Sequence, residues 1–377
     1  MQTGKLIFEK KIIASAIIYF FISGILLFRY GIQLGGEAEK YIDNANRILN
    51  QEELRNGFFG FFYVVYSLLV AFFVKFSINL VFISVVQIGL SFFAAFCLYK
   101  LLIHVLENKK IAFVFFIAYL LCFPIQKWNF YLYSESVHNS FLVIGLYLFH
   151  KLLKEKNYKL LLSFAVMLLL ILFSRPVGLL FFLSATVVMI IWFYQNNRKI
   201  LFYLFSLLSI VAVIVILNSP VTAFINPDSL RRMEVICQVP EINTGSAYQE
   251  FNRQGLYKSY TVIKDEIGVG NFLKSGFKKL GYFFGMYRSY YSWQNNLLLL
   301  CYIIFYPFAL IGIFSKYGGS YYYIKLVSVF YLLLTSIAIF FTCDDWANRF
   351  ISPVFPFILI LAAGGFLSVY KRLNTTT

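Results

Sequence analysis

Three acidic residues follow a Gly-Gly pair near the start of the chain, although Asp and Glu together number only 17 of 377 residues. Apolar side chains recur through 37–50 at helical spacing, which predicts an amphipathic helix lying at a membrane interface. Glu37 then falls in the first turn, where the helix dipole favours an anion, so its carboxylate is suited to accept a proton from a bound hydroxyl. The alternative is an ordinary helix start with solvated acids. The three acids are Glu37, Glu39 and Asp43.

A second polar group, SESVHN (134–139), opens a long apolar segment. Glu135 lies at the outer end of the predicted spanning helix, with His138 and Asn139 one turn further along the same face. Ionisable groups at membrane depth are costly and are usually functional. A Glu-x-x-His pair can bind a metal ion in a helical bundle, but that design needs two copies, and the sequence contains one. The alternative is a helix capped by Ser134 that carries an interfacial Glu.

An arginine separates two apolar segments in FSRPVG (173–178). Arg175 ends one predicted helix, and Pro176 begins the next. An arginine held at the outer membrane edge in apolar surroundings attracts an anion, which is either a protein carboxylate or a phosphate headgroup. The alternative is that its side chain extends to the membrane interface and is solvated there.

The link before the last apolar segment reads TCDDWANRF (342–350). It brings Asp344, Asp345 and Arg349 together just before the final predicted helix. Asp345 and Arg349 have the i,i+4 spacing of a helical ion pair. The alternative to a functional role is therefore a charged turn that closes two helices.

The composition indicates that these residues belong to a membrane protein. Apolar residues make up 60% of the chain and charged residues 13%, with a mean hydropathy of +0.75, whereas about a quarter of a soluble domain is charged. Long apolar runs recur along the whole chain, which predicts a polytopic membrane protein. The net charge of +16 then reflects Lys and Arg in cytoplasmic loops and does not indicate nucleic-acid binding. The basic N-terminus and the apolar run to Phe28 lack a small-residue cleavage site, so we expect a retained first helix.

Ten segments are predicted as membrane spans. They cover residues 12–30, 80–103, 111–124, 132–150, 159–174, 177–194, 200–217, 297–314, 321–341 and 351–369. The stretch 58–76 is also apolar enough to span, but counting it would reverse the sidedness of everything after it. Without it, the short basic segments all fall in the cytoplasm, as the positive-inside rule requires. They contain Lys5, Lys10, Lys11, Lys100, Lys109, Lys110, Lys151, Lys154, Lys156, Lys159, Arg198, Lys199, Lys316, Lys371 and Arg372.

This layout places both termini in the cytoplasm and makes 58–76 an interfacial or re-entrant element. One membrane domain, 1–377, then carries three extracytoplasmic features: a first outer loop (31–79), a large loop (218–296) and the short link 342–349. Cys237 and Cys343 fall on the same outer side, which leaves a disulfide between them open, and no CxxC or Cys/His metal pattern occurs. The candidate site residues on this side are Glu37, Glu135, Arg175, Asp344, Asp345 and Arg349.

The chain resembles the GT-C glycosyltransferases in the order of its motifs: an acidic first loop, S-E-S, R-P-x-G, and D-x-x-x-R-F-x-x-P-x-x-P before the last helix. It is most similar to bacterial members such as protein O-mannosyltransferases and lipid A aminoarabinose transferases. The resemblance covers most of the chain, although loop 218–296 matches no motif of the family. It implies an all-α polytopic transmembrane bundle of about ten helices, with juxtamembrane helices in the first outer loop that include 58–76.

The resemblance also implies an activity. Such enzymes transfer a sugar, with inversion, from a polyprenyl-phosphate carrier in the inner (plasma) membrane to a glycan, lipid or protein acceptor outside the cytoplasm. Glu37 falls at the family's acidic catalytic position, where Asp is usual, and Asp43 is the reserve acid. Arg175 and Arg349 would bind the donor phosphate. Some relatives use a divalent cation, Mg²⁺ or Mn²⁺, for which the sequence shows no clear ligand set. Supporting or acceptor roles fall to Tyr41, Asp43, Glu135, His138, Asp344 and Asp345.

Three other classes of protein share parts of this pattern. A transporter or flippase for lipid-linked glycans would place charges near the bilayer midplane between broken helices, whereas the candidate site residues lie near the outer edge. A non-catalytic scaffold gives no reason for acids and arginines to collect on one face. An O-antigen or capsule polymerase is also polytopic, and it would use the arginines of the large outer loop, which are Arg231, Arg232, Arg253 and Arg288.

Overall fold

The structure is a computed structural model, and it describes residues 2–197 apart from 56 and 156, residues 199, 203, 205–207, 210 and 230–237, and residues 260–375 apart from 317, 318 and 346. Helices dominate these residues, and strand pairing among them is limited to two isolated bridges, Gln33 with Tyr131 and Ile236 with Asp344. The chain divides into two compact units, Met1–Gly178 with Ala362–Thr377 and Leu179–Leu361, and each is described by itself. A single membrane domain over 1–377 stays a prediction.

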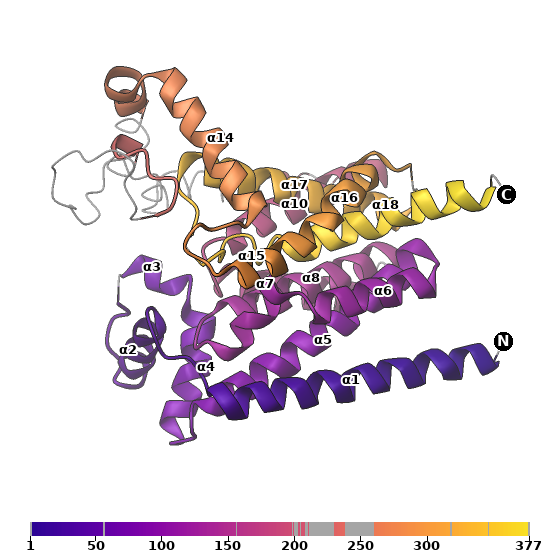
Figure 1. The fold of residues 1–377 in the computed structure, drawn as a ribbon, viewed down its shortest axis with the longest axis horizontal. Coiled ribbons are helices and arrows are strands. Elements are labelled where there is room, and N and C mark those ends of the chain that lie inside the picture. The colour runs from indigo at the N-terminus through magenta and orange to yellow at the C-terminus, as the bar shows by residue number, and fades with distance from the viewer. Residues whose placement is uncertain are drawn as a thin grey trace. The chain divides into compact units, whose positions relative to one another are not determined.

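The first unit is a helical bundle with short helices at one end. Its helices are α1 (Gln2–Tyr30), α2 (Ala38–Leu49), α3 (Phe58–Phe61), α4 (Val64–Lys75), α5 (Val81–Leu106), α6 (Lys109–Leu120), α7 (Phe123–Gln126), the 3-10 helix η1 (Lys127–Phe130), α8 (Glu135–Glu155) and α9 (Tyr158–Leu172). α5 packs against α1, α6 and α8, and α8 also packs against α9. α2, α3 and α4 lie at the end of this bundle away from the N-terminus (Figure 1).

The second unit contains most of α10 and the helices described from Val262 up to the first part of α18. They are α10 (Gly178–Gln195), the π-helix η3 (Val262–Ile267), α14 (Val269–Gly285), α15 (Trp293–Leu300), the 3-10 helix η4 (Cys301–Ile304), α16 (Phe305–Phe314), α17 (Ser320–Phe341) and the first part of α18 (Phe355–Thr375). α14 packs against α17, where the rings of Phe272 and Phe277 meet that of Phe340 at centroid distances of 5.5 and 5.6 Å. This contact places α14 beside the end of α17 that leads into the 342–354 link.

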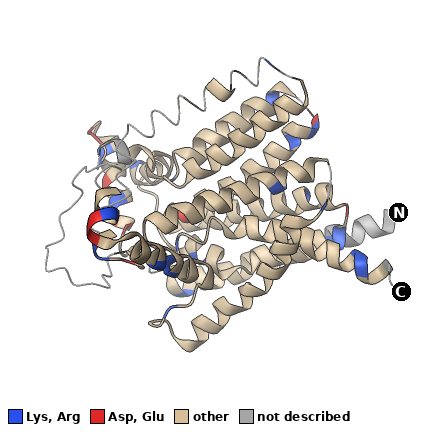
Figure 2. Cartoon of the chain, turned by 90° about the horizontal axis from the view of Figure 1, so that it is seen from above, with Lys and Arg blue, Asp and Glu red and all other residues tan. Residues whose placement is uncertain are grey.

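Six helices in the described residues are long and apolar enough to cross a membrane, so the chain is a multi-pass membrane protein. They are Lys10–Tyr30 within α1, Val81–Leu106, Gly178–Gln195, Trp293–Phe314 from α15 to α16, Ser320–Phe341 and Phe355–Asn374. Charged residues collect near the ends and connections of the helices, and most of each long helix body carries none of them (Figure 2). This is the distribution that a hydrocarbon core demands.

The predicted total of about ten spans is not reached by these helices alone. The predicted span 132–150 forms α8, but polar side chains fill its first turns, and the span 159–174 forms only the 15-residue α9. The predicted span 200–217 lies mostly outside the described residues. The prediction 111–124 corresponds to a helix pair, Lys109–Leu120 and Phe123–Phe130, which is bent by 49°. The higher number of spans stays a prediction.

The bend after α6 is caused by a proline and stabilised by side-chain hydrogen bonds. Pro124 lies in the first turn of α7 and has no N–H to continue the helix. Gln87, in the second turn of α5, donates from its amide to the carbonyls of Trp128, Asn129 and Tyr131 at 3.0–3.3 Å. Irregular backbone at membrane depth is tolerated only where protein groups satisfy it. Gln87 therefore holds the segment that leads into α8.

The apolar stretch 58–76 does not form one long helix. It gives the four-residue α3 and the 12-residue α4, whereas about 20 residues are needed to cross a bilayer as a helix. α4 packs against α2, which is the amphipathic helix expected over 37–50. This pairing supports the prediction that 58–76 stays at the interface.

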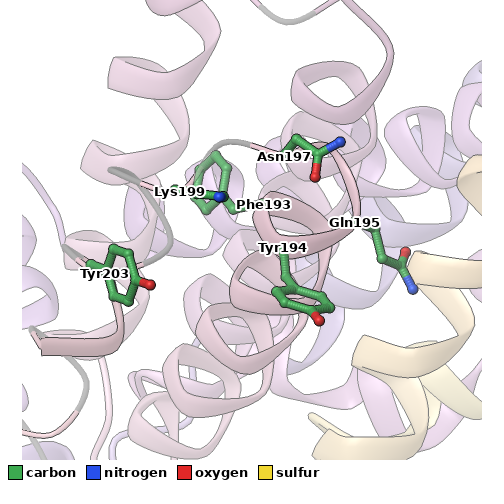
Figure 3. Close-up of a pocket in the computed structure, with 6 residues that line it drawn as sticks. All are labelled: Phe193, Tyr194, Gln195, Asn197, Lys199 and Tyr203. Carbon is green, nitrogen blue, oxygen red and sulfur yellow. The ribbon is translucent and has the colours of Figure 1, made fainter.

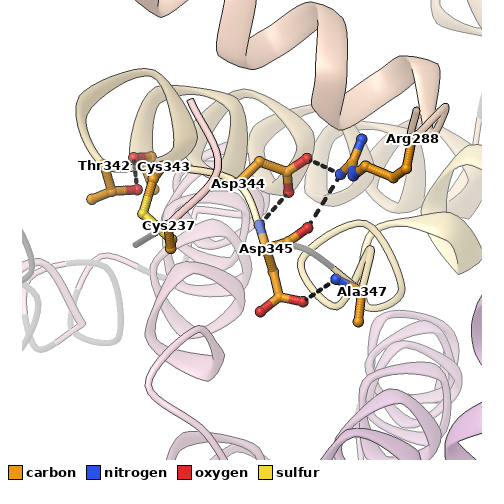
Figure 4. Close-up of a disulfide and its surroundings, with 8 residues drawn as sticks. Cys237, Arg288, Thr342, Cys343, Asp344, Asp345 and Ala347 are labelled. Carbon is orange, nitrogen blue, oxygen red and sulfur yellow. Dashed lines mark hydrogen bonds and ion pairs between the residues drawn. A yellow bond between two sulfur atoms is a disulfide. The ribbon is translucent and has the colours of Figure 1, made fainter. Parts of the chain in front are cut away.

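A disulfide between Cys237 and Cys343, the pairing that the sequence left open, joins the large loop to the link after α17 (Figure 4). The backbone N–H of Asp344 donates to Val235, and that of Cys237 donates to the carbonyl of Asp344, each at 2.8 Å. The two half-cystines are separated by 106 residues. The disulfide therefore constrains a long stretch of chain against the residues that precede α18.

We expect Cys343→Ser to lower the free energy of unfolding by about 2–5 kcal/mol, because it removes a cross-link that restricts the unfolded chain. Thermal or denaturant unfolding of the protein in detergent measures this difference. Cys301→Ser is the matched control, since Cys301 is a free, exposed cysteine and its replacement should leave stability unchanged. Identical unfolding curves for the two variants would mean that the disulfide does not constrain the fold.

Candidate functional site

Residues just after α1 are paired with the segment that precedes α8. The backbone N–H of Gln33 donates to the carbonyl of Phe130 at 2.8 Å, and that of Leu132 donates to the carbonyl of Gln33 at 3.1 Å. These two bonds form the parallel bridge between Gln33 and Tyr131. Two parts of the sequence about a hundred residues apart are thereby aligned, and one contains the acidic turn while the other contains the S-E-S motif.

The hydroxyl of Tyr133 closes the acidic turn onto this segment. It donates to the carbonyl of Gly35 at 2.8 Å and accepts from the backbone N–H of Glu37 at 3.2 Å. Gly36, between them, has a φ of +65°, and a Cβ there would lie 2.5 Å from the Tyr133 hydroxyl. Only glycine fits both the left-handed backbone and the close approach. The turn therefore determines where Glu37, the residue before α2, is placed.

A second contact holds α2 against the same segment. The Tyr41 side chain is fully buried, and its hydroxyl lies 3.0 Å from the Ser134 hydroxyl. Its ring packs edge-on against Tyr66 of α4, with 4.8 Å between the ring centroids. Tyr41, for which the resemblance implied a supporting role, therefore holds α2 through both its hydroxyl and its ring. Glu37 remains half-buried at the start of this helix.

Glu135 and Arg175 form a buried ion pair. Oε1 of Glu135 lies 3.1 Å from Nη1 of Arg175, and the side chains are 0% and 5% exposed. The sequence allowed a protein carboxylate or a phosphate as the partner of Arg175, and the structure provides a carboxylate. Removing two charges from water is costly, and the cost is offset only when the charges face each other and their remaining polar atoms find partners.

A neighbouring contact joins the same two elements. Nδ1 of His138 lies 2.7 Å from the Ser174 hydroxyl, and both residues are fully buried. Glu135 and His138 are three residues apart on α8 and share one face, while Ser174 and Arg175 are consecutive in the turn after α9. Two pairs of side chains therefore fasten this turn to α8. Together with Glu37 and Tyr41, five of the nine predicted site residues are brought together in the first unit.

Asp43 does not belong to this group. Its carboxylate pairs with Arg47 one turn further along α2, at 3.1 Å, and both side chains are more than a third exposed. The pair follows from i,i+4 spacing alone and is worth a few tenths of a kcal/mol at most, about 0.3–0.5 kcal/mol. The sequence named Asp43 as the reserve acid, and the structure gives it a solvated helical partner instead.

The aspartates of the link after α17 form a separate cluster in the second unit (Figure 4). Asp344 pairs with Arg288, and both side chains are almost completely buried. Nη2 of Arg288 also donates to the carbonyl of Asp345 at 3.2 Å. Oδ1 of Asp345 accepts from the backbone N–H of Ala347 at 2.8 Å. The predicted phosphate ligand Arg349 is buried on the same link.

No sequence pattern distinguishes Arg288 from the other arginines of the large loop. Its guanidinium also donates to the carbonyls of Tyr282 and Tyr287, and Asn296 bonds to its backbone at both N–H and carbonyl. Burial raises the pKa of Asp344 to about 6, although the positive charge of Arg288 acts in the opposite direction. At neutral pH the carboxylate is therefore ionised and the pair is formed. Arg288 organises the approach to α18.

Lys279 is a second buried cation that sequence reasoning missed, because it lies in an aromatic-rich stretch typical of an interfacial belt. Its side chain is 1% exposed and lies on the buried face of α14. Burial lowers its pKa to about 8, and the negative charge of Glu234 opposes this shift. Its helical spacing from Phe272, Ser275 and Phe283 was the available signal, since these share its face.

The second unit also contains an open cavity of about 430 Å³ near the end of α10 (Figure 3). Its lining combines aromatic rings with amide and ammonium groups, and none of the predicted site residues is among them. The lining residues are Phe193, Tyr194, Gln195, Asn197, Lys199 and Tyr203. This cavity is therefore not the site that the sequence predicted.

A divalent-cation site does not fit the part of the chain that the structure describes. No group of three or more His, Cys, Asp or Glu side chains there could hold a metal ion. Glu135 and His138 have the spacing of a metal-binding pair, but Arg175 and Ser174 are their partners. We derive no reaction step through a metal ion.

Comparisons with known proteins add no assignment. No protein family model, no curated protein and no solved structure matches this chain. Any proposed function must therefore be based on the residues and their contacts.

We expect Gly36→Ala to destabilise the protein by about 1–3 kcal/mol, because it forces an L-residue into a left-handed backbone and against the Tyr133 hydroxyl. Thermal unfolding in detergent measures the effect. Gly35→Ala is the matched control, since a Cβ at Gly35 meets no atom within 4 Å. Equal stability of the two variants would show that the Tyr133 contact does not constrain the turn.

Glu135→Gln should cost about 3–5 kcal/mol of stability, because it leaves the Arg175 charge buried without its counter-ion. Adding Arg175→Met should restore part of the loss, since the uncompensated charge is then gone. Asp43→Asn serves as the comparison for an exposed pair and should cost no more than about 0.5 kcal/mol. Denaturant unfolding of the four proteins gives these differences, and similar values for Glu135→Gln and Asp43→Asn would contradict the burial argument.

Proposed function

We propose that this protein is a membrane glycosyltransferase that moves a sugar from a polyprenyl-phosphate carrier to a glycan, lipid or protein acceptor outside the cytoplasm. The observation that supports this most is the Tyr133 hydroxyl, which ties the Glu37 turn to the segment before α8. The first residue of α8, Glu135, holds the buried Arg175. A half-buried carboxylate and a guanidinium thus occur in one compact unit among apolar helices.

A polyprenyl-phosphate donor explains why a carboxylate and a guanidinium occur together in a membrane protein. An isoprenoid tail requires apolar helices open to the bilayer, and the phosphate requires a cation at the membrane edge. Arg175 uses Nη1 toward Glu135, and a guanidinium has five N–H donors, so its other edge is available to a phosphate oxygen. Arg349, the other phosphate ligand expected from the sequence, is buried on the link after α17 in the second unit, and its role stays a prediction.

The reaction is a single displacement. Glu37 removes the proton from the acceptor hydroxyl as its oxygen attacks the anomeric carbon of the sugar. The bond between that carbon and the phosphate oxygen breaks, the phosphate leaves with the bonding electron pair, and the configuration at the anomeric carbon is inverted. A phosphate needs no general acid to leave, and Arg175 stabilises the charge that it gains.

The disulfide supports the proposed side of the membrane. Disulfides persist in oxidising compartments outside the cytoplasm, and the Cys237–Cys343 bond lies directly before the Asp344–Asp345 cluster. The link 342–349 would accordingly face away from the cytoplasm, as the distribution of Lys and Arg also predicts. In this proposal the protein lies in the inner (plasma) membrane with both termini in the cytoplasm.

A polysaccharide polymerase is less well supported. Such an enzyme would bind lipid-linked glycans through arginines of the large loop. Arg288 is held by Asp344, and Arg231 makes a two-pronged contact with Glu266 at 2.6 and 2.7 Å. Arg288 thus donates from both Nη atoms, and Arg231 from Nε and Nη2, to groups within the protein. Nε of Arg175, in contrast, makes no hydrogen bond in the described residues. Arg253 lies outside those residues.

Glu37→Gln should reduce sugar transfer by a factor of about 100–10,000, the usual effect of removing a general base. Purified protein would be incubated with a panel of polyprenyl-phosphate sugars, and release of free carrier phosphate would be followed. Asp43→Asn is the matched control on the same helix and should keep its activity within about twofold, as its carboxylate faces Arg47. Full transfer by Glu37→Gln would assign the base to another residue.

A further inference from the structure

The hydrogen bonds around His138 fix which ring nitrogen carries a proton. The Ser174 hydroxyl donates to the carbonyl of Ile171 at 2.8 Å, and a hydroxyl has one hydrogen to give. Its 2.7 Å contact with Nδ1 of His138 is satisfied at the same time only if Nδ1 is the donor. A second proton on this ring would place another positive charge beside buried Arg175, which is costly. His138 is therefore a neutral imidazole protonated at Nδ1.

The other nitrogen of this ring is then a buried acceptor. Nε2 of His138 is fully buried and has no hydrogen-bond partner within the part of the chain that the structure describes. Such an acceptor is costly unless a donor reaches it. Because Nδ1 is occupied by Ser174, the lone pair on Nε2 is the free hydrogen-bonding position of this side chain.

Arg175 presents the complementary group in the same cluster. Its Nε is buried and makes no hydrogen bond to any residue in the described ranges, and Nη1 faces Glu135 without hydrogen-bond geometry. Ser174 and Arg175 are consecutive, and they contact His138 and Glu135 on one face of α8. The cluster therefore contains a cationic donor and a neutral acceptor on elements that are fastened to each other, each on a side chain that is more than nine-tenths buried.

We propose that this cluster binds a glycosyl phosphate, with Arg175 on the phosphate and Nε2 of His138 accepting a hydrogen bond from a hydroxyl of the sugar. The inference rests on the proposed function and adds to it the residue that distinguishes a loaded carrier from an empty one. A fully ionised phosphate has acceptors but no donor, so it satisfies Arg175 and leaves His138 unpaired. A sugar hydroxyl next to the phosphate satisfies both. His138 is then a specificity-determining residue that touches the donor sugar.

Two substitutions of His138 distinguish the role of Nδ1 from that of Nε2. The amide of His138→Asn reaches the position of Nδ1 and keeps a partner for Ser174, but it has nothing at Nε2. The longer His138→Gln places an amide oxygen near the position of Nε2 and loses the Ser174 contact. A purely structural role for His138 therefore favours Asn as the tolerated replacement, whereas recognition of the sugar favours Gln.

The experiment compares binding of empty polyprenyl phosphate with binding of a panel of polyprenyl-phosphate hexoses, amino sugars and pentoses to the purified protein in nanodiscs. We expect the wild type to prefer at least one loaded carrier. His138→Asn should lose about tenfold in affinity for that carrier, the effect of one lost hydrogen bond, with unchanged affinity for the empty carrier. His138→Gln should keep most of the preference. Thermal unfolding of both variants verifies that they are folded.

The outcomes distinguish this inference from the proposed function. If His138→Asn still preferred the loaded carrier, the role of Nε2 would be overturned, whatever the result for His138→Gln. Equal binding of empty and loaded carriers by the wild type would overturn the inference and leave phosphate binding intact. If no carrier, loaded or empty, bound to the wild type, the proposed function would fail along with it.

Discussion

The position of Glu37 depends on one side chain, Tyr133. Its hydroxyl bonds to both sides of a turn that only a glycine can form, and its backbone belongs to the segment that opens α8. Glu37 is therefore not positioned by α2 alone, because the Tyr133 contacts attach the start of this amphipathic helix to the segment before α8. The Tyr41–Ser134 contact adds a second point of attachment one turn further along.

The segment that carries Tyr133 is itself held by polar groups inside the bundle. The Gln87 amide of α5 donates to two carbonyls of η1 and to that of Tyr131 just after it, and Gln126 accepts from Tyr19 and Asn129 at 2.8 Å each. These bonds explain how a break in a membrane-spanning region is stable, since hydrocarbon offers no partner for free backbone groups. The same break brings Glu135 to the start of its helix, where it meets Arg175. Fold and site therefore share one hydrogen-bond network.

Much of this arrangement was accessible from the sequence, because it depends on local pattern. The amphipathic spacing through 37–50 predicted α2, and the positive-inside count predicted that the apolar stretch 58–76 does not span. The positive-inside count placed Glu37, Glu135 and Arg175 on one side, and the structure brings them into one unit. What the sequence could not supply were partners between distant segments: Asp344 pairs with Arg288, 56 residues away. The Asp43–Arg47 pair, by contrast, follows from i,i+4 spacing that the sequence already shows.

The proposed function depends on a donor site formed by the Glu37 turn and the Glu135–Arg175 pair. An experimental structure of the protein with a bound polyprenyl-phosphate sugar tests it most directly. We predict the phosphate beside the Arg175 guanidinium and the anomeric carbon facing the Glu37 carboxylate, with room for an acceptor hydroxyl between them. A carrier phosphate bound elsewhere, with Glu37 turned toward solvent and no sugar near α8, would contradict the account.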